Sequence, residues 1–178
     1  HQIIYGKTKV AGVRLYDSVT GPDGRDLNRI IAFTGHEITA FDEIYFNDTL
    51  ITYDGTGLIT GPAQYANAGR IFFRTGHPGQ GYMGELSAQD PAWTANHKLE
   101  GIAYIYLFLS FSRDSYPNGI PEVSAVIRGK PIYDPRTGLT SYSNNPALIA
   151  RDYITSSYGL AAPIGEVDDA RIQAAANV

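Results

Sequence analysis

The amino-acid sequence predicts a mainly β protein, an antiparallel sandwich or barrel-like fold with short C-terminal α-helices, and therefore α+β overall. Runs that alternate apolar and polar residues, separated by Gly- and Pro-rich turns, fill residues 1–140, as in antiparallel sheets. Over 141–178 the apolar residues recur at helical spacing instead. Only 18% of the residues are charged and 13 are Tyr, a composition common in β-rich proteins that bury surface against other proteins. We expect a β-rich domain over 1–140 and, over 141–178, a helical segment that links to a following module.

The first strands are short and are separated by clear turns. Gly21 and Gly24, with Pro and Asp between them, mark a turn-rich loop. Asn47 and Asp48 lie between two alternating runs and favour a tight hairpin, because Asn and Asp tolerate the backbone geometry of such turns. The expected strands cover residues 9–17, 28–39, 41–48, 49–54 and 70–75.

The strongest strand signal is GIAYIYLFLSFSRD, residues 101–114. Read with a period of two, one face is apolar throughout and should be core; it comprises Ala103, Ile105, Leu107, Leu109 and Phe111. The other face carries Tyr104, Tyr106 and Phe108 before it becomes hydroxylic. We expect these three rings to be covered by another domain or subunit; in this chain by itself, some of them should be exposed or capped only by residues 76–100. Residues 123–133, VSAVIRGKPIY, are expected to pair with this strand.

Residues 76–100 are expected to form a long irregular loop, since ELSAQDP shows no convincing helix pattern. Loops of this length are usually functional, mobile or covered by a partner. Gly79, Gly81 and Gly84 have the G-x-G-x-x-G spacing, but phosphate binding by that motif requires a strand before it and a helix after it. We interpret these glycines as loop residues. Trp93 is expected to cover the core or to anchor an interface.

The stretch that follows the last predicted strand indicates a rigid joint between two modules. Asp134, Pro135 and Gly138 favour a turn, which we expect to lead the chain out of the β domain. Asn145 and Pro146 are typical of a helix start, because Asn caps the first amides and Pro suits the first helical position. A connection defined by both turn and cap residues is expected to set the direction of the helix that follows.

Two helices are expected after this joint. The first begins at a cap supplied by Asn144 or Asn145 and ends near Gly159, a residue that suits the position just past a helix. The second begins at Asp168 and Asp169, because acidic side chains suit the positive N-terminal end of a helix.

No residue pattern predicts a catalytic site, a metal site or a bound cofactor. The chain has no Cys and its four His are scattered, whereas zinc needs convergent His, Cys or carboxylate ligands. Asp42 and Glu43 are adjacent on a predicted strand and point to opposite faces, and Asp168 and Asp169 suit a helix start. Neither pair presents two carboxylates to one substrate, as a glycoside hydrolase requires. We therefore predict that the chain is not an enzyme.

Charge and hydropathy also limit the partners. The net charge of −4 gives no reason to expect nucleic acid, which is bound by basic surfaces. The longest apolar run, residues 102–109, is far too short to cross a bilayer. Direct nucleic-acid binding and membrane insertion are therefore not expected.

Six segments of the chain, taken in order, are YGKTKVAGV, GHEITAFDEIYFND, DPAWTANHKLEGIAYIYLFLSFSRD, GIPEVSAVIRGKPIYDPRTG, SNNPALIARDYI and DDARIQAAANV. Together they resemble the tail-tip host-specificity protein J of lambda-like siphophages and related prophage tail proteins. The resemblance covers nearly the whole chain, and residues 133–152 are its most specific part. Residues 54–69 and 76–90 depart from it.

This resemblance implies a structural role in a virion tail tip, assembled in the cytoplasm of the bacterial host. It implies an internal segment of a longer protein, from the half that builds the trimeric baseplate hub closing the tail tube. The expected partners are two further copies of the full-length protein and other tail-tip and tail-tube proteins. The family supplies no catalytic residues to carry over, and the distal receptor-binding part has no counterpart in these residues.

Two other functions stay open on the residues alone. A carbohydrate-binding β module would use Trp93 and Tyr82 as an aromatic platform. A tail-associated cell-wall hydrolase would need two carboxylates that converge in a cleft.

Overall fold

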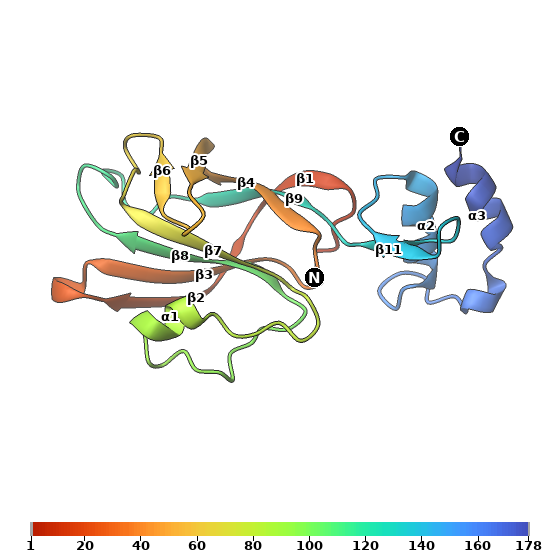
Figure 1. Ribbon diagram of the computed structural model, residues 1–178, viewed down its shortest axis with the longest axis horizontal. Coiled ribbons are helices and arrows are strands. Elements are labelled where there is room, and N and C mark those ends of the chain that lie inside the picture. The colour runs from red at the N-terminus through yellow and green to blue at the C-terminus, as the bar shows by residue number, and fades with distance from the viewer. Residues whose placement is uncertain (1, 178) are drawn as a thin grey trace.

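Two antiparallel β-sheets pack face to face in this protein, and a small helical unit follows them (Figure 1). The computed structural model describes residues 2–177. The five-stranded sheet has the order β1 (Lys7–Ala11), β9 (Val123–Arg128), β4 (Ala40–Phe46), β5 (Thr49–Tyr53) and β6 (Ile59–Gly61). The four-stranded sheet has the order β2 (Val13–Thr20), β3 (Asp26–Thr34), β8 (Ala103–Ser110) and β7 (Gly69–Thr75). This architecture confirms the predicted fold class.

The main core lies between the two sheets, and β8 shows how the sequence builds it. The predicted aliphatic face of β8 points into this core, where Ile105 and Leu107 are fully buried beside Ile44 and Ile127 of the opposite sheet. The aromatic face of β8 points away from the opposite sheet and belongs to a second apolar cluster. Because successive side chains of a strand alternate between faces, one strand contributes to both clusters.

The predicted strand over 9–17 is divided at Gly12, and this corrects the prediction. β1 belongs to the five-stranded sheet and β2 to the four-stranded sheet, so the chain changes sheets at this residue. A Cβ atom on Gly12 would lie 2.1 Å from Ile31 Cγ2 and 3.0 Å from Phe33 Cζ. The crossing therefore needs a residue without a side chain, since the backbone passes directly over two core side chains.

The expected partner of the central strand is also corrected. β9 pairs with β1 and β4 in the five-stranded sheet, whereas β8 pairs with β3 and β7. β9 packs across the core from β8 instead of beside it. Both strands have the same apolar alternation. Such alternation predicts which residues are buried, but it does not predict which strand lies beside them.

The hairpin predicted at Asn47 and Asp48 is confirmed. These residues join β4 to β5, and the ladder begins with the pair Phe46 and Thr49. Their φ angles are 47° and 64°, a left-handed backbone that Asn and Asp adopt more readily than other residues with a side chain.

Residues 76–100, which we call the cover segment, lie over the outer face of the four-stranded sheet (Figure 1). The segment contains a short helix, α1 (Gly84–Gln89), where the sequence predicted only irregular structure. Its buried residues Met83, Leu86 and Trp93 pack on the sheet. The helix is only six residues long, and tertiary packing stabilises such helices more than local propensity does.

The chain then builds a C-terminal unit from a hairpin and two helices (Figure 1). The hairpin consists of β10 (Ile132–Asp134) and β11 (Leu139–Ser141), and the helices are α2 (Pro146–Thr155) and α3 (Asp169–Ala176). Their small core contains Ile132, Leu148 and Ala176. β10 and most of β11 fall inside the range 1–140 expected for the β domain, yet the two strands form a sheet of their own, and Ile132 of β10 packs with the helices.

Two 3-10 turns complete the chain, η1 (Pro22–Gly24) between β2 and β3 and η2 (Ile164–Glu166) before α3. Within residues 2–177, every helix is too short or too polar to cross a membrane.

Candidate functional site

The predicted turn residues Asp134, Pro135 and Gly138 form the tight connection between β10 and β11. The Asp134 carbonyl accepts hydrogen bonds from the amides of Thr137 and Gly138, and Gly138 has a φ of 72°. This corrects one expectation: the turn closes a hairpin inside the C-terminal unit and does not lead the chain out of the sandwich. The exit lies earlier, after β9.

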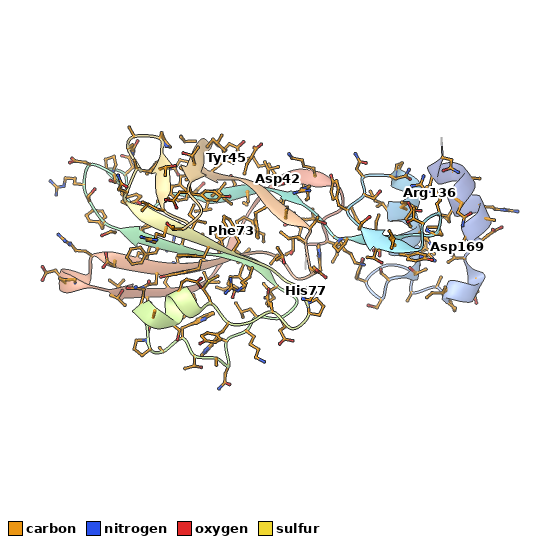
Figure 2. The ribbon with its side chains drawn as sticks, viewed as in Figure 1. Asp42, Tyr45, Phe73, His77, Arg136 and Asp169 are labelled. Atoms are coloured by element: carbon orange, nitrogen blue, oxygen red, sulfur yellow. The ribbon has the colours of Figure 1, made fainter. Side chains whose placement is uncertain are left out.

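This turn holds the end of α3, a contact that the sequence did not indicate. Arg136 Nη1 donates to the Ala176 carbonyl at 2.7 Å, and Gln173 Nε2 donates to the Pro135 carbonyl at 2.9 Å. The guanidinium of Arg136 (Figure 2) therefore meets the negative end of the helix, where a cation is favourable. Arg136 also binds Asp134, and this hydrogen bond holds the pKa of the Asp134 carboxyl below its ordinary value.

Asn145 caps α2, as predicted, and Pro146 is the first helical residue. The Asn145 side-chain oxygen accepts from the amides of Ala147 at 3.0 Å and Leu148 at 3.4 Å. Its side-chain nitrogen donates to the Ala176 carbonyl at 3.0 Å. One side chain therefore provides hydrogen-bond partners both for the first amides of α2 and for a carbonyl at the end of α3.

Asn145→Ala is expected to lower the free energy of unfolding by about 0.5–2 kcal/mol, the usual cost of losing a helix cap. The value should lie in the upper half of this range, because the Ala176 carbonyl also loses a donor. Urea unfolding measures the change. Asn144→Ala is the matched control, since Asn144 is exposed and is not the cap. Equal effects of the two substitutions would contradict this role for Asn145.

An ion pair between a buried arginine and a partly exposed aspartate joins the two helices. Arg151 is only 7% exposed, and its Nε lies 2.6 Å from Asp169 Oδ1. The guanidinium also lies 4.8 Å from the centre of the Tyr133 ring on β10. Asp169 (Figure 2) was predicted as a helix-start residue, and Asp168 beside it is the cap of α3. Sequence reasoning missed Arg151, because no local pattern relates it to a carboxylate 18 residues away.

The chain leaves the sandwich at Gly129 and Lys130, which lie against the N-terminal segment. The amide of Gly129 donates to the Gly6 carbonyl at 2.7 Å, and that of Lys130 donates to the Ile4 carbonyl at 2.8 Å. A Cβ atom on Gly129 would lie 2.2 Å from the Ile4 carbonyl oxygen. The exit from the sandwich is therefore a close backbone contact between segments far apart in the sequence.

Asp152 of α2 is the centre of a polar cluster at this exit. Its carboxylate accepts from Tyr5 at 2.5 Å, from Tyr158 at 2.6 Å and from Lys130 Nζ at 2.8 Å. Burial alone would raise the pKa of Asp152, but hydrogen bonds from Lys130, Tyr158 and Tyr5 hold it below its ordinary value. Because Tyr5 precedes β1 and Asp152 lies in α2, this cluster fastens the C-terminal unit to the sandwich. We call these four residues the Asp152 cluster.

His36 supports the same contact from the sandwich side. Its Nε2 accepts a hydrogen bond from the Ile4 amide at 3.0 Å, and Nδ1 then donates to the Glu37 carbonyl at 2.7 Å. Burial, together with the nearby positive charge of Lys130, lowers the pKa of His36 below its ordinary value of 6.5. The neutral imidazole is the form that fits, since protonation would remove the acceptor at Nε2.

The stability of the protein is expected to fall as the pH drops below about 6.5, the ordinary pKa of His36. The unfolded chain binds a proton at this residue more readily than the folded chain, so the contribution is complete above that pH and is lost toward the lower pKa of the folded state. Urea midpoints measured from about pH 7 to pH 5 test this. His36→Gln keeps an acceptor and should flatten the profile; parallel profiles would rule out His36 as the cause.

The expected interface residues lie mostly inside the chain, as expected for a chain in which residues 76–100 cap the aromatic face. Tyr104 and Tyr106 are 0% and 1% exposed, and Trp93 is 4% exposed. The cover segment, and not another subunit, packs over the two tyrosines. Phe108 stays partly exposed at the border of this contact.

The aromatic platform expected of a carbohydrate-binding module is also not formed. Trp93 is buried against Tyr16, with ring centres 5.2 Å apart, whereas Tyr82 is 38% exposed.

The carboxylate of Asp42 (Figure 2) forms ion pairs with Lys7 at 3.0 Å and with Arg128 at 2.9 Å. Over residues 2–177, His, Asp and Glu side chains nowhere gather in a group of three that could hold a metal ion.

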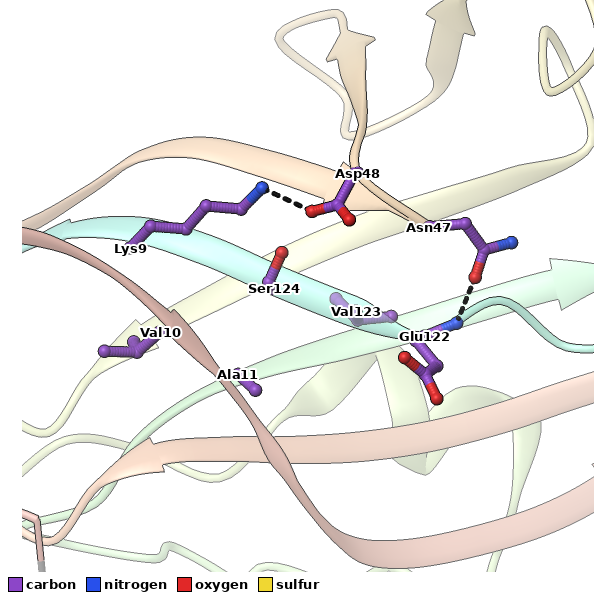
Figure 3. A pocket seen from close by; sticks show the side chains of 8 residues that line it. All are labelled: Lys9, Val10, Ala11, Asn47, Asp48, Glu122, Val123 and Ser124. Atoms are coloured by element: carbon purple, nitrogen blue, oxygen red, sulfur yellow. Dashed lines mark hydrogen bonds and ion pairs between the residues drawn. The ribbon is translucent and has the colours of Figure 1, made fainter.

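A polar hollow of about 300 Å³ lies at one end of the five-stranded sheet (Figure 3). Lys9 Nζ donates to Asp48 Oδ1 at 2.7 Å, and the Asn47 side chain accepts from the Glu122 amide at 2.9 Å. Lys9 also lies over the Tyr45 ring, 3.9 Å from its centre. These polar groups are paired with one another, and their contacts stabilise the β4–β5 hairpin against the neighbouring strands.

Comparisons with known proteins add a likeness in fold. No protein-family model and no curated protein matches the chain. Among solved structures, a chain from the virion of a native gene transfer agent particle matches with a TM-score of 0.50 and 17% sequence identity. The match covers 70% of the present chain and 25% of that chain. The likeness at this identity is one of fold, and the present chain corresponds to about a quarter of the length of the chain it matches.

Proposed function

We propose that this chain is a structural module of a bacteriophage or prophage tail tip, within the trimeric baseplate hub that closes the tail tube and carries the receptor-binding apparatus. The observation that carries this proposal is the fold shared with a chain of the gene transfer agent virion. The sequence segments that resemble protein J point to the same kind of particle, and to its tail tip in particular.

The partial match in length supports the idea of a module. A chain that corresponds to a quarter of a virion protein is the size of one ordinary domain. In this view the functional property of the chain is the fixed direction of its C-terminal unit. The Asp152 cluster fastens that unit to the sandwich, and the Arg151–Asp169 pair fastens its two helices. A hub module needs such rigidity, because its neighbours must meet around one channel.

The free edge of the four-stranded sheet is a second feature that suits a subunit of an assembly. β2 is a terminal strand, and its side chains Val13, Leu15 and Val19 are 66%, 47% and 60% exposed. β1, the terminal strand of the other sheet, carries Lys7 and Lys9 instead. Charged residues protect an edge strand against pairing with other chains, and exposed apolar ones do not. We therefore expect β2 to lie against a neighbouring protein in the particle.

Electron microscopy of the intact particle tests the proposal. The expected result is density for this fold in three copies at the end of the tail, around the axis of the tube. Density for the fold in the capsid, or in a copy number that three-fold symmetry does not allow, would contradict the tail-tip assignment. A free chain that is absent from purified particles would contradict any structural role in the virion.

A further inference from the structure

The cover segment protects the outer face of the four-stranded sheet without belonging to the main core. The core between the sheets contains no residue of 76–100, and the segment adds no strand to either sheet. Its own apolar contacts form a separate cluster in which Met83, Leu86 and Trp93 meet Tyr104 and Tyr106. Both sheets and the core between them therefore keep all of their residues when this segment moves away from the sheet.

The contact under the cover segment contains the unpartnered polar atoms of the described chain. Within residues 2–177, three buried side-chain polar atoms lack a hydrogen-bond partner: Trp93 Nε1, Tyr104 OH and Ser18 Oγ. Trp93 and Tyr104 belong to the cluster beneath the segment. The Ser18 hydroxyl lies on β2 near the Asp90 carboxylate, whose pKa it helps to lower. Such atoms destabilise the state that buries them, because they have lost water without gaining a partner.

Three sets of polar contacts hold the segment. Arg74 of β7 holds its first turn: Nη2 donates to the Tyr82 carbonyl at 3.2 Å and lies 3.7 Å from Glu85 Oε2. The other two lie at its ends. At its root, close to His77 (Figure 2), the buried Gln80 accepts from the Gly76 amide at 3.0 Å and donates to the Leu99 carbonyl at 2.6 Å. This side chain ties the two legs of the segment to each other. At the far end, Tyr16 of β2 donates to Asp90 at 2.5 Å. The root contact survives when the segment lifts from the sheet, whereas the contacts of Arg74 and of Tyr16 with the segment break.

We propose that residues 81–98 form a lid that opens and closes as a unit on the folded sandwich, hinged at the Gln80 root and latched by the Tyr16–Asp90 hydrogen bond. Opening breaks the latch, hydrates Tyr104 OH and Trp93 Nε1, and exposes the aromatic face of β8. Gly76 and Gly101 flank the lid with φ angles of 81° and 75°, which only glycine adopts without strain. This inference rests on the contacts of the cover segment and does not depend on the proposed role in a virion.

Native-state hydrogen exchange on the purified chain tests the lid. The amides of Ser87, Asp90 and Trp93 are hydrogen-bonded to carbonyls of the lid itself. These bonds become open to exchange when the lid leaves the sheet, because a helix as short as α1 depends on its packing. The β8 amides report global unfolding. The lid amides are expected to exchange together and well before the β8 amides, by local opening. Trp93 is the only Trp in the chain, so acrylamide quenching of its fluorescence reports the same opening. Lid amides that exchange only together with β8 would overturn the proposal.

Two conservative substitutions should shift the opening in opposite directions. Tyr16→Phe removes the latch and should speed lid exchange on the order of tenfold, the effect of losing one hydrogen bond to a charged group. Tyr104→Phe removes a hydroxyl that is unpartnered only when the lid is closed, so it should slow lid exchange. If the two substitutions acted only through lost packing, lid exchange would be faster in both variants. That result would overturn the proposal.

Tyr45→Phe is the matched control for the latch. Tyr45 donates to Glu43 at 2.5 Å, as Tyr16 does to Asp90, but Tyr45 lies on β4 in the other sheet. This substitution should leave the exchange of the lid amides and the quenching of Trp93 unchanged. Equal effects of Tyr16→Phe and Tyr45→Phe on the lid would show that Tyr16 is not a latch.

Discussion

Asp152→Ala is expected to lower the free energy of unfolding by about 2–4 kcal/mol, because it removes the acceptor shared by four donors, Ser156 Oγ among them, and leaves a partly buried ammonium unpaired. Tyr5, Lys130 and Tyr158 all donate to this carboxylate. The side chains of Lys130 and Asp152 are 24% and 16% exposed, so water compensates only in part. The loss should also free the C-terminal unit from the sandwich, since Tyr5 is the tie between them.

Urea unfolding measures this loss, and hydrogen exchange of the α2 amides measures the freedom of the C-terminal unit. Asp48→Asn is the control: Asp48 also accepts from a lysine, at 2.7 Å, but its side chain is 88% exposed, and Asn keeps a residue that suits the left-handed backbone of this turn. An exposed pair of this kind contributes about 0–1 kcal/mol. A loss at Asp152 no larger than the loss at Asp48 would show that the Asp152 cluster does not hold the two parts together.

Gly129→Ala is expected to destabilise the protein by about 1–3 kcal/mol, the usual cost of forcing extra atoms into a packed site. The new Cβ atom would lie 2.2 Å from the Ile4 carbonyl oxygen and 2.6 Å from its carbon. These are backbone atoms, so the N-terminal segment must move as a whole. That movement breaks the hydrogen bonds that Gly129 and Lys130 donate to Gly6 and Ile4, and it draws Tyr5 away from Asp152.

Thermal unfolding and small-angle scattering test this second expectation, the former for stability and the latter for the orientation of the C-terminal unit. Gly165→Ala is the control, because a Cβ atom there has no neighbour within 4 Å. The double variant Gly129→Ala with Asp152→Ala should lose less than the sum of the single losses, since both act on the contact of Tyr5. Full additivity would show that the two sites are independent.

The sequence by itself determined the features that depend on a few neighbouring residues. Asn145 and Asp168 cap their helices through their own side chains, and Asn47 with Asp48 adopts the backbone of a hairpin turn. The two faces of β8 followed from simple alternation along one strand. In each of these cases the cause lies within one turn of helix or one step of the pleat, where local chemistry decides.

Tertiary structure alone decided which distant segments meet. β9 joined the sheet opposite β8, and the chain changed sheets at Gly12, because the neighbours of a strand depend on the whole topology. Tyr104 and Tyr106 are covered by the cover segment, whose short helix is not indicated by its own residues. Tyr5 and Asp152 are 147 residues apart, and no local pattern relates them. Such contacts arise from the burial of shared surface, whose free energy depends on the folded chain as a whole and not on any one stretch of it.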